Sequence, residues 1–297
     1  MTDQTRITEN LQTAPDGDLE SIEAPVKAFF DQHADYYEQS WDLREHGLNV
    51  GIFENGDDLE EGYQRSRVHV IGLLNRIYPL ASDSRVLDVC CGTGATLAQV
   101  IDHHGCAGVG VDISETQLAH AQRLRNHRGR RERGDLMFRQ GSASLIDDVV
   151  RDQAPFTHVF SQEGLLFAHD KHRAVKGMFD LLAPGGALVI SDFVPQASKE
   201  DIDAALRARV YEDVKWAGGL SFQQYLTLLK ETGFELVQAE LRPLDMERTY
   251  EKLIPRTEAM AADGGEIYSF LAKRYAGIVT AIRAGALSWG WLAARKP

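Results

Sequence analysis

The chain has 297 residues, of which 43% are hydrophobic and 26% are charged, so it is long enough and apolar enough to bury a sizeable core. Its formal net charge of -12 at pH 7 argues against a nucleic acid as partner, because binding to a phosphate backbone depends on clustered Lys and Arg. No uninterrupted apolar run of about 18 residues is present, which argues against a membrane partner.

The chain has three cysteines, Cys90, Cys91 and Cys106, and the first two are adjacent. An odd number without CxxC spacing is typical of reduced thiols rather than of a disulfide framework or a zinc site, so we expect a cytoplasmic location. The first 20 residues lack the basic and apolar stretches of a signal peptide, and their polar, acidic composition predicts a disordered tail over 1–20. A homodimer is left open.

The predicted elements begin with helices and continue as an alternation. Apolar residues at helical spacing predict a first helix over 26–41, and a second is expected over 59–77. Strands are then predicted at 85–90, 107–112, 136–140, 156–161 and 186–193, with helices at 94–103, 115–126, 144–152 and 170–182 and an APGG turn before the fifth strand. Such alternation is typical of a parallel sheet with helices on both faces.

The pattern changes after Ser191. Helices are predicted at 198–215 and 221–232, followed by a strand at 234–241, a long helical block and a last strand at 286–294. Inserted blocks of this length are usually lids or partner surfaces. We therefore expect a core domain over 81–297 and a helical lid, built from the N-terminal helices within 21–80 and from insertions at 196–232 and 243–285.

The stretch VLDVCCGTGA at 86–95 runs from an apolar strand into two glycines. A strand that ends in Gly92-Thr93-Gly94 and leads into a helix lets a ligand approach the backbone closely, because neither glycine carries a Cβ. A dinucleotide site needs a third glycine three residues later, where this chain has Leu97. Asp88, four residues before Gly92, adds a carboxylate near the end of the strand. These features favour a ligand with a positive group over a pyrophosphate.

Asp112 ends the next predicted strand, 18 residues after Gly94. A carboxylate at this place can accept hydrogen bonds from both hydroxyls of a ribose. Capping the next helix is the alternative role, but Ser114 is available as the cap, and Gln117 three residues later completes an S-x-x-Q capping box. Gln117 is therefore expected to serve either the cap or an adenine ring.

Together these motifs resemble the class I S-adenosylmethionine-dependent methyltransferases. VLDVCCGTG is similar to their first motif, VGVDIS to their ribose-binding acid, and LLAPGGALVISD to the turn and strand that follow their fourth motif. The resemblance covers residues from about 60 to 297. It implies an α/β, Rossmann-like sheet of seven strands, mostly parallel with the last strand antiparallel, that binds S-adenosylmethionine and methylates a small molecule.

The resemblance also implies the residues of the cofactor site. Asp88, Gly92 and Gly94 are expected to hold the amino-acid end of the cofactor, and Asp112 the ribose. The full set of expected cofactor-binding residues is Trp41, Asp88, Cys90, Gly92, Gly94, Asp112, Ile113, Gln117, Ser142, Ala143 and Gln162. One position departs from the pattern: in RQGSAS, many members have an acid after the glycine to accept from the adenine amino group, whereas this chain has Ser142. Ser142 is kept as an adenine contact.

A closer resemblance links the chain to sarcosine and dimethylglycine N-methyltransferases and related natural-product enzymes. It is carried by YYEQSWDLREHGLNVGIFE, SQEGLLFAHDK and LSWGWLAARKP. It implies that Tyr36, Tyr37 and Trp41 close over the cofactor, with ordinary helix packing as the alternative for each, and aromatic faces can also hold a cationic amine. Such enzymes accept amines, phenols and carbon nucleophiles, so the resemblance predicts a small acceptor in specialised metabolism and leaves the methylated atom open.

An acceptor that carries a proton needs a base, and the loop after the fourth strand offers Glu163, His169 and Asp170. The alternative for His169 and Asp170 is that they start a helix. The candidate catalytic residues are Tyr37, His46, Glu163 and His169. His169 and His172 lie three apart, but no third ligand is near, so no metal is expected.

Two other functions remain open at this point. An enzyme of this fold can use the cofactor for cyclisation, which leaves the substrate mass unchanged, whereas methyl transfer adds one methylene unit. A catalytically silent regulatory or scaffold protein is the other alternative, and the run RLRNHRGRRER at 123–133 could dock an anionic partner. The ordinary interpretation of that run is a solvated helix end. Intact motifs at Asp88, Gly92 and Asp112 favour the enzyme.

Overall fold

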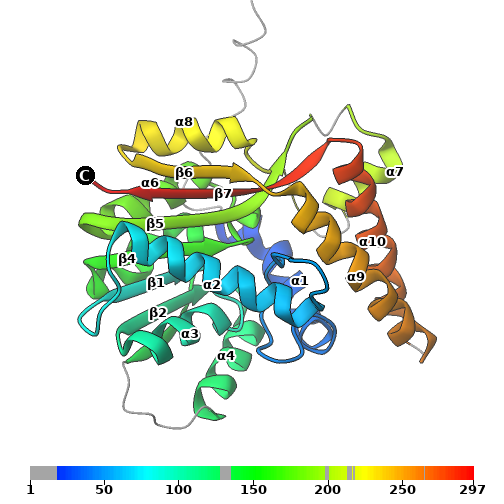
Figure 1. Cartoon of the computed structure of the whole chain (residues 1–297), viewed down its shortest axis with the longest axis horizontal. Helices are drawn as coiled ribbons and strands as arrows, with labels where there is room; N and C mark the ends of the chain where they lie inside the picture. Colours follow the sequence, from blue (N-terminus) through cyan, green and yellow to red (C-terminus); the bar gives the residue numbers. More distant parts are fainter. Residues whose placement is uncertain (1–18, 128–134, 198–200, 213–215, 217, 264) are drawn as a thin grey trace, which may run out of the picture.

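Seven strands form one sheet at the centre of the computed structural model, which describes residues 19–297 except 128–134, 198–200, 213–215, 217 and 264 (Figure 1). The strands are β1 (Arg85–Val89), β2 (Ala107–Asp112), β3 (Leu136–Gln140), β4 (Phe156–Gln162), β5 (Leu182–Pro195), β6 (Glu235–Leu241) and β7 (Leu287–Arg295). Their order is β3-β2-β1-β4-β5-β7-β6, and β7 runs antiparallel to both neighbours while the other pairs are parallel. The predicted mostly parallel sheet with an antiparallel last strand is confirmed.

The helices alternate with the strands as the sequence predicts. The longer ones are α1 (Leu19–Ser40), α2 (Leu59–Ile77), α3 (Ala95–His104), α4 (Glu115–His127), α6 (Lys171–Leu181), α8 (Phe222–Thr232), α9 (Pro243–Ala262) and α10 (Glu266–Arg283). The short ones are η2 (Ala143–Leu145), α5 (Ile146–Val150), η3 (Arg151–Gln153), η4 (Leu165–Phe167), α7 (Ala204–Arg207) and η5 (Ala208–Glu212). The bounds of α2 match the predicted 59–77, because Asp58 and Glu61 form a reciprocal capping box that starts the helix there.

Both faces of the sheet are covered, and the side chains of each strand alternate between two hydrophobic cores. In β1, Val86 belongs to the core beneath α2 and α3, whereas Leu87 and Val89 belong to the core beneath α6 and α8. β7 alternates in the same way, with Trp289 and Trp291 on the first side. The central strands β1, β4, β5 and β7 are therefore largely buried on both sides, whereas the edge strands β3 and β6 remain partly exposed.

A separate group of helices lies beyond the carboxyl ends of the parallel strands. Figure 1 shows α9 and α10 side by side at this end of the sheet, with α1 close to them. By contrast, α2 packs on β5 and β7, and α8 packs against α6 and β6, so both belong to the layers on the sheet. Of the helices expected in the lid, α1, α9 and α10 lie at this edge of the sheet, and α7 and η5 pack against α10. Their role as a lid stays a prediction.

Several expected boundaries differ in the structure. β5 begins at Leu182 rather than at 186, because the APGG turn is built into the strand: Phe156 pairs with Leu182 and His158 with Ala187, which leaves a bulge. The expected helix over 198–215 is reduced to α7 and η5, with its ends outside the described residues. Most of the expected disordered tail also lies outside them, and α1 begins at Leu19.

The arginine run can be followed only in part. Arg123, at its start, forms an ion pair with Glu38, and residues 128–134 lie outside the described part of the chain. Among the described residues, no helix is both long and apolar enough to cross a membrane.

Candidate active site

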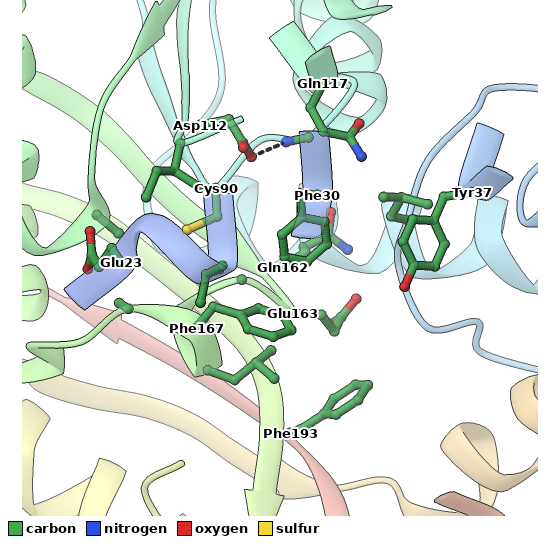
Figure 2. Close-up of a pocket in the computed structure, with 18 of the residues that line it drawn as sticks. Glu23, Phe30, Tyr37, Cys90, Asp112, Gln117, Gln162, Glu163, Phe167 and Phe193 are labelled. Carbon is green, nitrogen blue, oxygen red and sulfur yellow. Dashed lines mark hydrogen bonds between the residues drawn. The ribbon is translucent and has the colours of Figure 1, made fainter. Parts of the chain in front are cut away.

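A cavity lies at the carboxyl edge of the sheet, between the strand tips and the helices beyond them (Figure 2). It holds about 1030 Å³ of atom-free space, part of it open to solvent. The lid side contributes Glu23, Val26, Phe30, Tyr37, Trp41, Leu48, Tyr250 and Arg274, and the sheet side contributes Cys90, Gly92, Asp112, Ile113, Gln117, Gly141, Ala143, Gln162, Glu163, Gly164, Leu166, Phe167, Ala168 and Phe193. This combination of apolar walls with a few polar side chains is typical of small-molecule sites.

The loop after β1 has left-handed backbone at Cys90, Gly92 and Gly94, with φ of 63°, 52° and 70°. Gly92 lines the cavity, and the nearest atom to a Cβ placed there is Gln117 Oε1 at 4.0 Å, so the bare side of the residue faces open space. Gly94 does not line the cavity, because a Cβ there would lie 2.7 Å from the Phe138 ring. Gly92 therefore lies where a cofactor contact was expected, whereas Gly94 lies against Phe138 and away from the cavity lining.

Asp112 closes the opposite side of this loop. One carboxylate oxygen accepts a hydrogen bond from the backbone N–H of Gly92 at 2.8 Å, and the other accepts from the backbone N–H of Ser114 at 2.9 Å. Burial raises the pKa of Asp112, and these two hydrogen bonds work in the opposite direction. Asp112 lines the cavity, and each of its oxygens can accept a further hydrogen bond, which suits a pair of neighbouring hydroxyl donors.

Two amide side chains of the cavity lining have buried polar atoms without partners. Both polar atoms of the Gln117 side chain are buried without a hydrogen bond, although the residue is only 2% exposed. The expected capping box is therefore incomplete: Ser114 Oγ accepts from the backbone N–H of Gln117 at 3.1 Å, but the Gln117 side chain does not return the bond. Gln162 accepts from Thr96 Oγ1 at 2.6 Å and leaves its own Nε2 unpaired. Buried amides of this kind fit a bound polar ligand.

The far end of the cavity lies against the loop after β3. Ile113 and Ala143 line it as expected, whereas Ser142 does not, because its hydroxyl accepts from the backbone N–H of Ser144 and caps η2. A carboxylate nonetheless reaches this end from α1: Glu23 lines the cavity and accepts from Ser144 Oγ at 2.8 Å. The sequence motif around Ser142 gave no signal for it.

A smaller recess continues from the cavity past Gln162. It is lined by Gly47, Leu48, Asn49, Asp88, Cys90, Cys91, Gly92, Thr93, Ala95, Thr96 and Gln162. Burial, together with the nearby Asp112 carboxylate, raises the pKa of Asp88 well above its usual range. A cationic group next to Asp88 would lower this pKa again, so the recess suits a ligand with a positive end. The two spaces together fit S-adenosylmethionine, with hydroxyls at Asp112 and an amino group toward Asp88.

Glu163 is the carboxylate that projects from the tip of β4 into the cavity (Figure 2). It accepts three hydrogen bonds: from the backbone N–H of Val50 at 2.9 Å, from Ser191 Oγ at 2.6 Å and from Trp289 Nε1 at 2.8 Å. Burial raises its pKa to about 8 against the lowering effect of these donors. A carboxylate has about four acceptor sites, so one remains for a ligand. Glu163 can therefore take up a proton near neutral pH.

The expected aromatic cover is partly in place. Tyr37 and Trp41 line the cavity, but Trp41 also donates through Nε1 to the Tyr275 hydroxyl at 2.7 Å and is packed in an aromatic cluster. Tyr36 points away, is 37% exposed and contacts the Tyr268 ring at 5.7 Å. The rings of Phe30 in α1 and Phe167 pack edge to face, with their centroids 5.0 Å apart, and both line the cavity. Neither residue was predicted from the sequence.

The two histidine candidates lie outside the lining. His169 is exposed, and its neighbour Asp170 caps α6 by accepting from the backbone N–H of Arg173, so the helix-start interpretation is the one that fits. His46 adopts φ of 60°, and its backbone carbonyl accepts from Thr93 Oγ1 at 2.8 Å, but its ring does not line the cavity. Neither histidine reaches the space in which an acceptor would lie.

His169 and His172 belong to no group of three potential metal ligands within the described ranges. Such a group is formed elsewhere by Asp35, Glu38 and His120. The His120 ring is buried, and its two nitrogens each lie 2.9 Å from one of these carboxylates. These contacts between the imidazole and the two carboxylates join α1 to α4.

Comparison with known proteins assigns the family. Residues 63–239 match the methyltransferase domain family. An O-methyltransferase from Pyrenophora dematioidea is 27% identical over 214 residues, which cover 72% of this chain and 76% of that protein. A sarcosine/dimethylglycine N-methyltransferase from Halorhodospira halochloris is 23% identical over 238 residues, which cover 80% of this chain and 81% of that protein.

Solved structures share the fold of this chain. The structure of a cyclopropane synthase from Mycobacterium tuberculosis superposes with a TM-score of 0.79 at 20% identity, covering 92% of this chain and 98% of that one. The family match spans both the glycine loop after β1 and the cavity-lining loop after β4. The chain therefore belongs to the methyltransferase domain family and is an S-adenosylmethionine-dependent methyltransferase.

Proposed function

We propose that the enzyme methylates a small, mostly apolar acceptor held between the tip of β4 and the helices α1, α9 and α10. The observation that carries this proposal is that Glu163, a carboxylate able to accept a proton, lines the same cavity as Gly92 and Asp112. Base and cofactor loop thus border one space. When bound, S-adenosylmethionine supplies a methyl group on a sulfonium sulfur.

The cofactor is held by residues of the strand tips. Asp112 accepts from the ribose hydroxyls, and the unpaired amides of Gln117 and Gln162 bond the polar groups on either side. Many members of the family have an acid at the position of Ser142, and in this chain Glu23 takes its role by accepting from the adenine amino group. Its support is that Glu23 is fixed to η2, the turn that directly follows Ser142, through Ser144.

Glu163 removes the proton from the acceptor. Its hydrogen bonds to Val50, Ser191 and Trp289 fix the carboxylate in one orientation. Raising the pKa toward the working pH makes such a group an effective base, because it is then both deprotonated in part and strongly basic. Phe30, Phe167 and the lid helices exclude water around the reacting atoms, which favours a reaction in which charge is lost.

The proposal also covers the metabolic role of the enzyme and its location in the cell. The apolar lining and the O-methyltransferase relative support an acceptor from specialised metabolism, with a phenol or another hydroxyl as nucleophile. Three free cysteines, Cys90, Cys91 and Cys106, support a reducing cytoplasmic location.

The test is incubation of the purified protein with methyl-labelled S-adenosylmethionine and a panel of phenols, amines, indoles and terpenoids, followed by mass spectrometry. A labelled product heavier by one methylene unit is expected. A product of unchanged mass would assign the chain to cyclisation instead, and a protein that binds the cofactor without forming any product from the panel would contradict the proposed acceptor class.

A further inference from the structure

Arg274, in α10, lies in the wall of the cavity although its side chain carries a permanent charge. The residue is 7% exposed, and its Nε is buried without an acceptor. Leaving a charged donor buried and unpaired costs free energy, so such a group is retained where a ligand supplies the partner.

Arg67, the second buried arginine among the described residues, has a complete set of partners for its charge. Arg67, 1% exposed, pairs with the buried Asp42 carboxylate and donates to the amide oxygens of Gln64 and Gln99. Within the described residues, Arg274 has no carboxylate partner. Two phenols lie next to it: burial raises the pKa of Tyr37 and Tyr250, and Arg274 lowers both. A hydrogen bond joins Arg274 to Tyr250, whose pKa the Glu163 carboxylate also raises, and the Arg274 Nε stays without an acceptor.

These groups come together from three separate helices. Tyr37 lies in α1, Tyr250 in α9 and Arg274 in α10, and all three line the cavity. The guanidinium has donors only, and each phenol hydroxyl can donate as well as accept, so the three groups together can donate to an anion. The fork of the guanidinium matches the two oxygens of a carboxylate. The rest of the lining is mostly apolar and includes Leu48, Phe30 and Phe193.

We infer that Arg274, with Tyr37 and Tyr250, binds a carboxylate on the acceptor, so that the substrate is an apolar carboxylic acid methylated at a second position. The inference rests on the proposed function, since it places the acceptor in the same cavity. The carboxylate of the cofactor is the competing partner. Arg274 does not line the recess next to Asp88, where the amino-acid end of the cofactor is assigned, so the acceptor is favoured.

The test uses the full chain saturated with S-adenosylhomocysteine and titrated calorimetrically with aromatic and aliphatic carboxylic acids, each paired with its primary amide. The amide has nearly the same shape without the charge. At least one acid should bind about tenfold or more tightly than its amide, the range expected for hydrogen bonds to a charged group. Arg274→Gln should remove this difference. Lys273→Gln, which removes an exposed charge from the neighbouring position, should preserve it.

Other results would overturn the inference. One is an absence of acid preference across the panel in the unmodified enzyme, a comparison that does not depend on whether the variant folds. Another is a preference that survives in Arg274→Gln. A loss of S-adenosylhomocysteine affinity in that variant, with unchanged circular dichroism, would assign the arginine to the cofactor. Failure of the unmodified enzyme to bind S-adenosylhomocysteine would instead contradict the proposed function itself.

Discussion

The backbone N–H of Gly92 donates to the Asp112 carboxylate over 2.8 Å, which joins the loop after β1 to the tip of β2. A Cβ-free residue with left-handed backbone and a half-buried acid are thereby fixed relative to one another. The same carboxylate faces the cavity with its remaining lone pairs. Backbone geometry and ligand binding at this point thus depend on one side chain.

Replacing Asp112 tests this dependence. Asp112→Ala should weaken S-adenosylhomocysteine binding by about 1–3 kcal/mol, because the ribose hydroxyls lose their acceptor and two backbone N–H groups lose theirs. Asp112→Asn should weaken it less, since the amide keeps one acceptor oxygen. Isothermal titration calorimetry measures both. Unchanged affinity in Asp112→Ala would place the ribose elsewhere.

Gly94 is predicted to matter for packing rather than for binding. Gly94→Ala should destabilise the fold by more than the roughly 1–2 kcal/mol that left-handed backbone costs a residue with a Cβ, because that Cβ would lie 2.7 Å from Phe138. Gly105→Ala is the matched control: its φ of 67° is similar, and a Cβ there meets nothing within 4 Å. Urea unfolding of the two variants should separate steric overlap from backbone strain. Equal losses would show that Phe138 moves aside freely.

The pH dependence of the reaction should report Glu163. Its deprotonated form is the base, and its pKa is about 8, so kcat/KM for the acceptor should rise with pH through that value. Glu163→Gln should remove this limb and lower the rate by about 10²–10⁴-fold. Ser191→Ala should shift the limb to higher pH, because the Ser191 hydroxyl is a donor that lowers the pKa of Glu163. A limb that stays in place in both variants would assign the proton transfer to another group.

Glu23 should determine the preference for adenine. A carboxylate accepts from the amino group of adenine and faces an oxygen in the corresponding position of hypoxanthine. The enzyme should therefore bind S-adenosylhomocysteine about tenfold or more tightly than S-inosylhomocysteine, and Glu23→Gln should narrow that ratio. Fluorescence or calorimetric titration of both nucleosides measures it. If the ratio is the same in both proteins, Glu23 serves only to anchor Ser144.

Sequence patterns predict the sheet well, because its elements are determined locally. The start of α2 follows from a capping box within four residues of chain, and the parallel direction of the first five strands follows from their alternation with helices. The predicted start of β5 was wrong, because it depends on contacts far away in the sequence. Gly185, with φ of 78°, is typical of a turn, but here it belongs to a bulge within the strand. Only the pairing with β4 and with the C-terminal segment shows this.

The cavity is less predictable, because its lid side is assembled by tertiary contacts. Asp112 and Gly92 are marked by their position at strand ends. Arg274, by contrast, lies in a helix with many other polar residues, and nothing in its spacing distinguishes a buried cation from an exposed one. The same holds for Glu23 in α1. His169 stood out by residue type, yet its position at the start of a helix turns it outward.

The bond from Trp289 to Glu163 joins residues 126 positions apart, because the final strand inserts between β5 and β6. During translation, a chain that has not yet emerged beyond residue 286 has no strand to connect those two and lacks one of three donors to Glu163. Assembly of the reaction centre must therefore await the synthesis of β7.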